Sequence, residues 1–106
     1  MAATIQITPQ LEPALERMQG KTLDEKIARL VANELRRYLE EVEREALEYE
    51  IKYGMNHEQF AAKLERGELG DPYAYELEQD AMRWEDLADE KKMWLEQFRQ
   101  VGGLVK

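Results

Sequence analysis

The residues of this chain that are able to do acid–base or metal chemistry are a single histidine and a run of glutamates. His57 lies in the segment Asn-His-Glu-Gln at the expected start of a short helix, and no second histidine completes a zinc motif. The glutamates between positions 40 and 50 lack the Glu-x-x-His pairs of carboxylate metal proteins. Because the chain also lacks cysteine, a glycine-rich phosphate loop and a Ser-His-Asp set, we expect no enzyme, no metal site and no cofactor.

A second set of polar side chains lies near the N-terminus, where it alternates with isoleucines. Thr4, Gln6 and Thr8 alternate with Ile5 and Ile7, which predicts a short β-strand over residues 3–8 with three polar side chains on one side. A lone strand of this length is unstable, and no other segment has the pattern of a strand. We therefore expect the strand to pair with that of a second copy, in a homodimer.

Two helices are expected to follow the strand. The first covers residues 10–19 and ends at Gly20. The second begins at Thr22, which forms a capping box with Glu25, and ends near Gly54. Its apolar side chains recur every three or four residues, at Leu23, Ile27, Val31, Leu35, Tyr38, Val42, Ala46, Tyr49 and Tyr53.

Two more helices are expected in the remainder of the chain. A short one begins at Asn56, with Gln59 in the capping-box position. A longer one is predicted from Asp71 and Pro72, which suit the first positions of a helix, to about Gln100. The fold class is thus mainly α, with a short N-terminal strand and about four helices.

Charged residues are unevenly distributed along the 106 residues, and the whole chain carries a formal net charge of -8. Residues 1–38 hold one more base than acid, whereas residues 39–106 hold eighteen acids and nine bases. The N-terminal third is therefore able to approach a polyanion, while the remainder would attract a basic partner or simply stay soluble. No apolar run is long enough to span a bilayer and no signal peptide is present, so we expect a soluble, cytoplasmic protein without a membrane partner.

Residues 3–41, in the order strand, short helix, glycine-containing turn and capped helix, resemble a ribbon-helix-helix unit. This resemblance implies a prokaryotic DNA-binding domain over residues 1–41 that inserts paired strands into the major groove. Thr4, Gln6 and Thr8 would then read bases of operator DNA, and Lys21 and Thr22 would hold a phosphate at the start of the second helix.

Residues 42–106 form an acidic, helical extension, similar to the tails with which antitoxins of this family bind a basic toxin. The resemblance implies an antitoxin-like regulator whose partner-binding side chains would be Trp84, Met93, Trp94 and Phe98. Aromatic residues at helical spacing are also typical of a core, and Trp94 lies beside the main stripe, where partial exposure is expected. The alternative is a helical oligomer that binds no DNA and has a structural or protein-interaction role.

Overall fold

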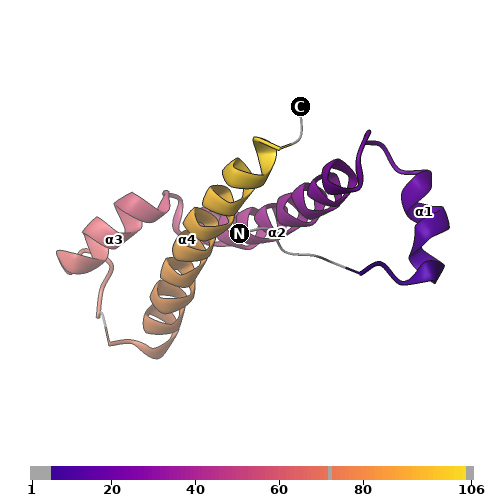
Figure 1. The fold of residues 1–106 in the computed structure, drawn as a ribbon. Helices are drawn as coiled ribbons and strands as arrows, with labels where there is room; N and C mark the ends of the chain where they lie inside the picture. Colours follow the sequence, from indigo (N-terminus) through magenta and orange to yellow (C-terminus); the bar gives the residue numbers. More distant parts are fainter. Residues whose placement is uncertain (1–5, 72, 105–106) are drawn as a thin grey trace.

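The computed structural model describes residues 6–71 and 73–104, and two long helices dominate it (Figure 1). A 3₁₀ turn, η1 (Pro9–Leu11), leads into the short α1 (Glu12–Glu16). The long helices are α2 (Leu23–Tyr53) and α4 (Tyr75–Gly102), and the nine-residue α3 (His57–Glu65) lies between them in sequence. The mainly α fold and the four helices predicted from the sequence are confirmed.

The limits of α2 follow from local signals at both ends. The Thr22 side chain accepts a hydrogen bond from the Glu25 N–H at 3.1 Å, which begins the helix as predicted. Gly54 ends the helix in the left-handed conformation, with φ of 68°. The proposed division between residues 41 and 42 falls inside this unbroken helix.

α3 begins as predicted, whereas α4 does not. Asn56 and Gln59 form a complete capping box at the start of α3. Asp71 was expected to cap α4, but α4 begins at Tyr75 with Ala74 as its N-cap. The Asp71 carboxylate instead accepts the Tyr73 N–H at 2.9 Å, in a local turn of the kind that competes with helix initiation.

The predicted N-terminal strand is wrong. Residues 6–8 belong to no strand, and no strand occurs among residues 6–71 and 73–104, while residues 3–5 lie outside the described part of the chain. Thr8 has φ of -59° and ψ of 133°, an extended conformation that suits a residue before proline and needs no ladder partner. In the part of the chain that the structure describes, the ribbon-helix-helix architecture therefore lacks its ribbon, because the alternation of two isoleucines supplies no second strand to bond with.

The core lies along one face of α2, against α4 and α3. From α2 it contains Leu35, Leu39 and Val42, and closer to the N-terminus the small residues Ala28 and Ala32. The opposing side chains are Phe60 of α3 and Leu77, Trp84 and Leu87 of α4. α4 runs antiparallel to α2, because Lys52 pairs with Asp80 at one end and Arg36 lies over the Phe98 ring at the other.

The molecule is far more extended than a self-contained domain of its size. It measures 58 × 26 × 21 Å, and its radius of gyration is 19.8 Å. A compact domain of this length has a radius of gyration of about 13 Å. α1 and its flanking residues extend from one end of the helical pair, and α3 covers the other end (Figure 1). One chain therefore leaves long stretches of helix surface without a neighbour.

Candidate interaction surfaces

A basic hollow lies between the segment after α1 and the first half of α2. It has a volume of about 530 Å³, and its cationic lining residues are Arg17, Lys26, Arg29 and Arg36. Gly20 lets the chain pass close to Lys26, since its φ of 138° is strained for other residues. The Nε of Arg29 is buried there without a hydrogen-bond partner, although its Nη2 donates to Glu25 at 3.3 Å.

The start of α2, which the sequence suggests as a phosphate site, is partly occupied by its own side chains. The Lys21 N–H donates to the Glu25 carboxylate at 3.1 Å, and the Glu25 N–H donates to the Thr22 hydroxyl. The hydrogen bond from the Lys21 backbone, followed by that from Arg29, lowers the pKa of Glu25. Glu25 therefore stays ionised and occupies the Lys21 N–H, a backbone donor that an external anion would need.

The residues predicted to read bases lack the strand that would present them, although Ile7 lines a hollow of about 220 Å³ together with Lys21 and Thr22. Gln6, Thr8, Lys21 and Thr22 are all exposed, and Thr4 lies outside the described residues. Because residues 6–8 are not a strand, the alternation that would direct Gln6 and Thr8 to one side is lost.

The four residues predicted to bind a protein partner separate into different environments on α4. Trp84 is only 2% exposed, and its ring lies 4.7 Å from that of Phe60 and 5.7 Å from that of Tyr49. Trp94 is half-buried, with its ring 4.8 Å from that of Tyr38.

Phe98 is also half-buried, beneath the Arg36 guanidinium. Met93 remains exposed, at 48%. Of the four, it is therefore the side chain that faces solvent most openly, and sequence spacing alone did not separate it from its neighbour Trp94.

An ion-pair network joins the distal half of α2 to α4. Lys52 Nζ lies 2.5 Å from the Asp80 carboxylate and 2.6 Å from that of Glu76, and Arg83 donates two hydrogen bonds to Glu45. Burial alone would raise the pKa of Asp80, but hydrogen bonds from Lys52 and Tyr53 outweigh it and lower that pKa. The network fixes the register of the two helices on a partly exposed surface.

Alkaline pH should destabilise the fold through Tyr53. Burial, followed by the 2.6 Å hydrogen bond to Asp80, raises the pKa of Tyr53 to about 12 from 10.0. Its stabilising contribution is therefore present below pH 10 and is lost as the pH rises toward 12. We expect this loss to reach about 1–2 kcal/mol, allowing for partial exposure.

The measurement is the melting temperature of the wild type and of Tyr53→Phe at a series of pH values. The phenylalanine variant cannot ionise at this position, so its melting temperature should fall less steeply above pH 10. Equal slopes for the two proteins would show that Tyr53 does not contribute.

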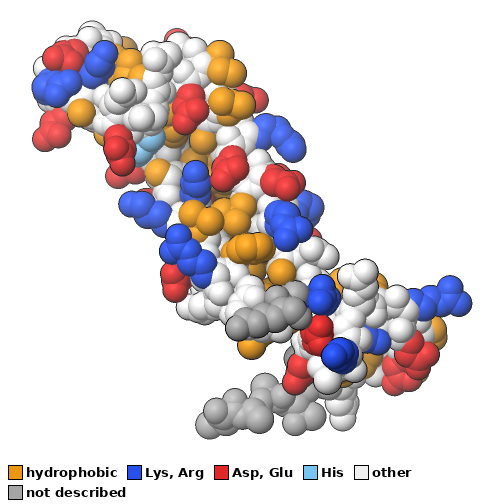
Figure 2. All heavy atoms as spheres, turned by 90° about the horizontal axis from the view of Figure 1, so that it is seen from above, with side chains coloured by type: hydrophobic (Ala, Val, Ile, Leu, Met, Phe, Trp, Pro, Cys, Tyr) orange, Lys and Arg blue, Asp and Glu red, His pale blue; other side chains and the backbone are white. Residues whose placement is uncertain are grey.

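Exposed apolar side chains accompany these charges, and several of them, such as Leu23 and Val31, belong to the stripe that the sequence predicts as apolar. In the face shown in Figure 2, apolar side chains form a band along the molecule with acidic and basic groups on both sides. On α2 the exposed large apolar side chains are Leu23, Leu30, Val31, Leu47 and Ile51. Their exposure depends on where α4 lies against α2, which the sequence pattern does not specify.

The described residues offer neither a metal centre nor a membrane-spanning helix. Within residues 6–71 and 73–104, no three His, Asp or Glu side chains are placed to hold a metal ion. Over the same residues, no helix combines the length and apolar character that crossing a bilayer requires. No family model, curated protein or solved structure matches this chain.

Proposed function

We propose that this chain is a helical protein-interaction protein that acts by binding another protein chain along the exposed faces of its long helices. One observation carries the proposal: among the described residues, twelve large hydrophobic side chains are exposed, eight of them on α2 and α4, whereas only nine hydrophobic residues are buried. Exposed apolar surface of this extent on a soluble chain marks an interaction site, because each side chain gains free energy when a partner removes it from water. The extended shape supports the same proposal.

The second candidate is the antitoxin-like role, in which α4 binds a basic protein. It is favoured by the outer face of α4, where Tyr75, Met82 and Met93 are exposed at 79%, 57% and 48%. The acidic residues beside them are Glu78, Glu85, Asp86, Asp89 and Glu96. Apolar contacts would hold a cationic partner there, and the carboxylates would steer its approach. Base reading by an N-terminal strand is not part of either proposal.

The size of the native protein tests the proposal. We expect gently lysed native cells to contain the protein in particles larger than the 12.5 kDa monomer. Size-exclusion chromatography with light scattering measures the mass, and mass spectrometry of the same fraction identifies the chains. A fraction that holds only this chain supports self-association, and one with a basic second protein supports the antitoxin-like role. A 12.5 kDa monomer, both in the extract and after purification at micromolar concentration, would contradict the proposal.

A further inference from the structure

One row of side chains on α2 lies next to the buried row that faces α4, which consists of Ala28, Ala32, Leu35, Leu39 and Val42. Successive members of this second row are three and four residues apart in alternation. We call this row the outer stripe. Its first half is basic and its second half is acidic. Tyr38 is not a member of the row, but its residue number lies midway between the two halves. Its members are Lys26, Arg29, Asn33, Arg36, Glu40, Glu43, Leu47 and Glu50.

The outer stripe is complementary to itself when two copies of α2 run antiparallel and the two-fold axis lies at the level of Tyr38 along the helix. Residues equally distant from Tyr38 then lie opposite each other, as the a and d positions of antiparallel helices do. Arg36 of one copy faces Glu40 of the other, and Lys26 faces Glu50. A parallel arrangement would instead place like charges opposite each other, which is unfavourable.

Exposed apolar side chains accompany both halves of the outer stripe. Leu23 and Leu30 flank the basic half and are 43% and 41% exposed, while Leu47 and Ile51 in the acidic half are 51% and 74% exposed. In the antiparallel pairing Leu23 is offset by two residues from Ile51 of the other copy and Leu30 by one residue from Leu47, so each pair lies within one helical turn. A two-fold axis repeats both contacts, so eight exposed apolar side chains would leave water together.

Each half of the outer stripe lines a hollow, and one charged member of each half already has an ion partner: Arg29 pairs with Glu25, and Glu43 pairs with Lys91. The basic half lines the 530 Å³ hollow, and the acidic half lines a second hollow of about 380 Å³ with Glu43, Leu47 and Glu50. Within the described part of the chain, Lys26, Arg36, Glu40 and Glu50 form no ion pair.

We propose that the protein forms a homodimer in which two α2 helices pair antiparallel along their outer stripes. The inference rests on the proposed function and names its partner as a second copy of this chain. Surfaces elsewhere favour a second copy less, because residues 39–106 carry nine excess negative charges and two such regions repel each other. The pairing sets each acidic half against a basic half and so removes this repulsion along α2.

Charge reversal with complementation tests the arrangement. One variant carries Lys26→Glu and Arg36→Glu, and a second carries Glu40→Arg and Glu50→Lys. Each alone places like charges opposite each other and should dimerise at least about tenfold more weakly than the wild type in sedimentation experiments. An equimolar mixture should form a heterodimer, because every altered position then faces its opposite charge. Circular dichroism confirms that each variant remains helical.

Two cysteine variants test the orientation, because the sequence contains no other cysteine that could form a disulfide. Asn33→Cys and Glu43→Cys lie equally far from Tyr38, so a mixture of the two should form a mixed disulfide under mild oxidation. The antiparallel geometry predicts this product in preference to a disulfide between two copies of the same variant.

Three results would overturn the arrangement: a monomeric wild type, charge variants that dimerise unchanged, or a mixture that forms neither heterodimer nor mixed disulfide. An assembly larger than the monomer that fails these tests would leave the proposed function standing with a different surface. A monomer in the native extract would remove both.

Discussion

Trp84→Ala should lower the free energy of unfolding by about 3–5 kcal/mol, the largest effect we expect from any single substitution in this chain. Trp84 is 2% exposed and is the largest fully buried side chain. Its ring contacts those of Tyr49, Tyr53, His57 and Phe60, which lie on α2 and α3, at centroid distances of 4.7–6.1 Å. Its removal leaves a cavity where three helices meet, and neighbours fixed on separate helices cannot close it.

Chemical denaturation followed by circular dichroism measures the loss, and the melting temperature should fall by about 4–8 °C for each kcal/mol. Trp94→Ala is the matched control, since it removes the same side chain from the same helix at a half-exposed position against Tyr38. We expect the control to cost clearly less. Equal losses for the two variants would contradict the assignment of Trp84 as the centre of the core.

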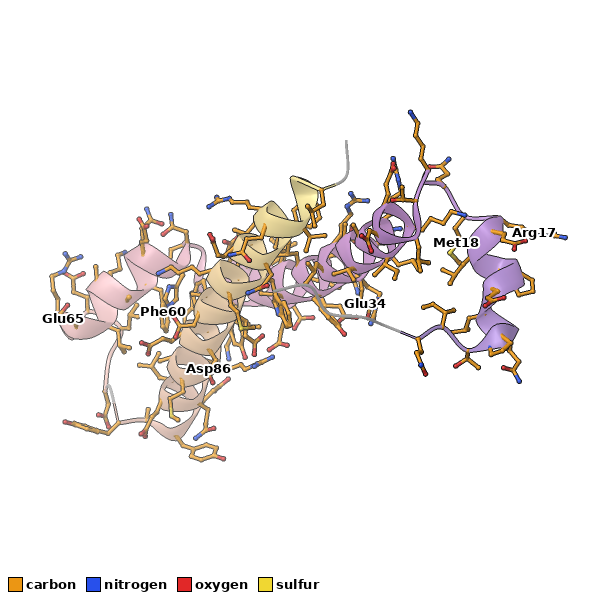
Figure 3. The ribbon with its side chains drawn as sticks, viewed as in Figure 1. Arg17, Met18, Glu34, Phe60, Glu65 and Asp86 are labelled. Atoms are coloured by element: carbon orange, nitrogen blue, oxygen red, sulfur yellow. The ribbon has the colours of Figure 1, made fainter. Side chains whose placement is uncertain are left out.

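Phe60→Ala should release α3 from the long helices while α2 and α4 stay paired. Phe60 is 1% exposed, and its ring lies 4.8 Å from that of Tyr53 and 4.7 Å from that of Trp84. Figure 3 shows Phe60 between α3 and α4, and Glu65 at the outer end of α3. A helix of nine residues is not stable in isolation, so loss of its buried anchor, worth about 3–5 kcal/mol, should unfold it locally.

Hydrogen exchange read by mass spectrometry distinguishes local release from global unfolding. Amides of residues 57–65 should exchange much faster in Phe60→Ala, while those in the middle of α2 and α4 keep most of their protection. Glu65→Ala changes an exposed residue of the same helix and should leave α3 protected. If α3 stayed protected in Phe60→Ala, other contacts than Phe60 would hold it in place.

Helix limits set by neighbouring residues could be read from the sequence. The Thr22 and Glu25 pair, the Asn56 and Gln59 pair and Gly54 all occur where the structure begins or ends a helix. Each of these signals acts within one turn of backbone, through a hydrogen bond or a left-handed residue, and so needs no distant part of the chain. The start of α4 was predicted at the wrong residue, because the Asp71 carboxylate accepts a hydrogen bond from the Tyr73 N–H instead of capping the helix.

The strand and the buried face of α2 depended on partners that a linear pattern does not supply. Alternating isoleucines favour a strand only when another strand accepts their hydrogen bonds, and the described chain offers none. In the first half of α2 the sequence predicted burial of Val31, but Val31 is 41% exposed and the small residues Ala28 and Ala32 are buried instead. The antiparallel course of α4, which brings Val101 to the hollow beside Ala28, decided which face is covered.

The sequence by itself determined a mainly helical chain, the limits of α2, the start of α3 and the separation of a nearly neutral N-terminal third from an acidic remainder, because these are local or additive properties. Only the tertiary structure decided that Trp84 is core, that Trp94 packs on Tyr38 and that Met93 faces solvent. Adjacent residues on a helix point about 100° apart, so their environments depend on where the neighbouring helix lies. That position is set by packing between segments far apart in sequence, which no pattern along one helix encodes.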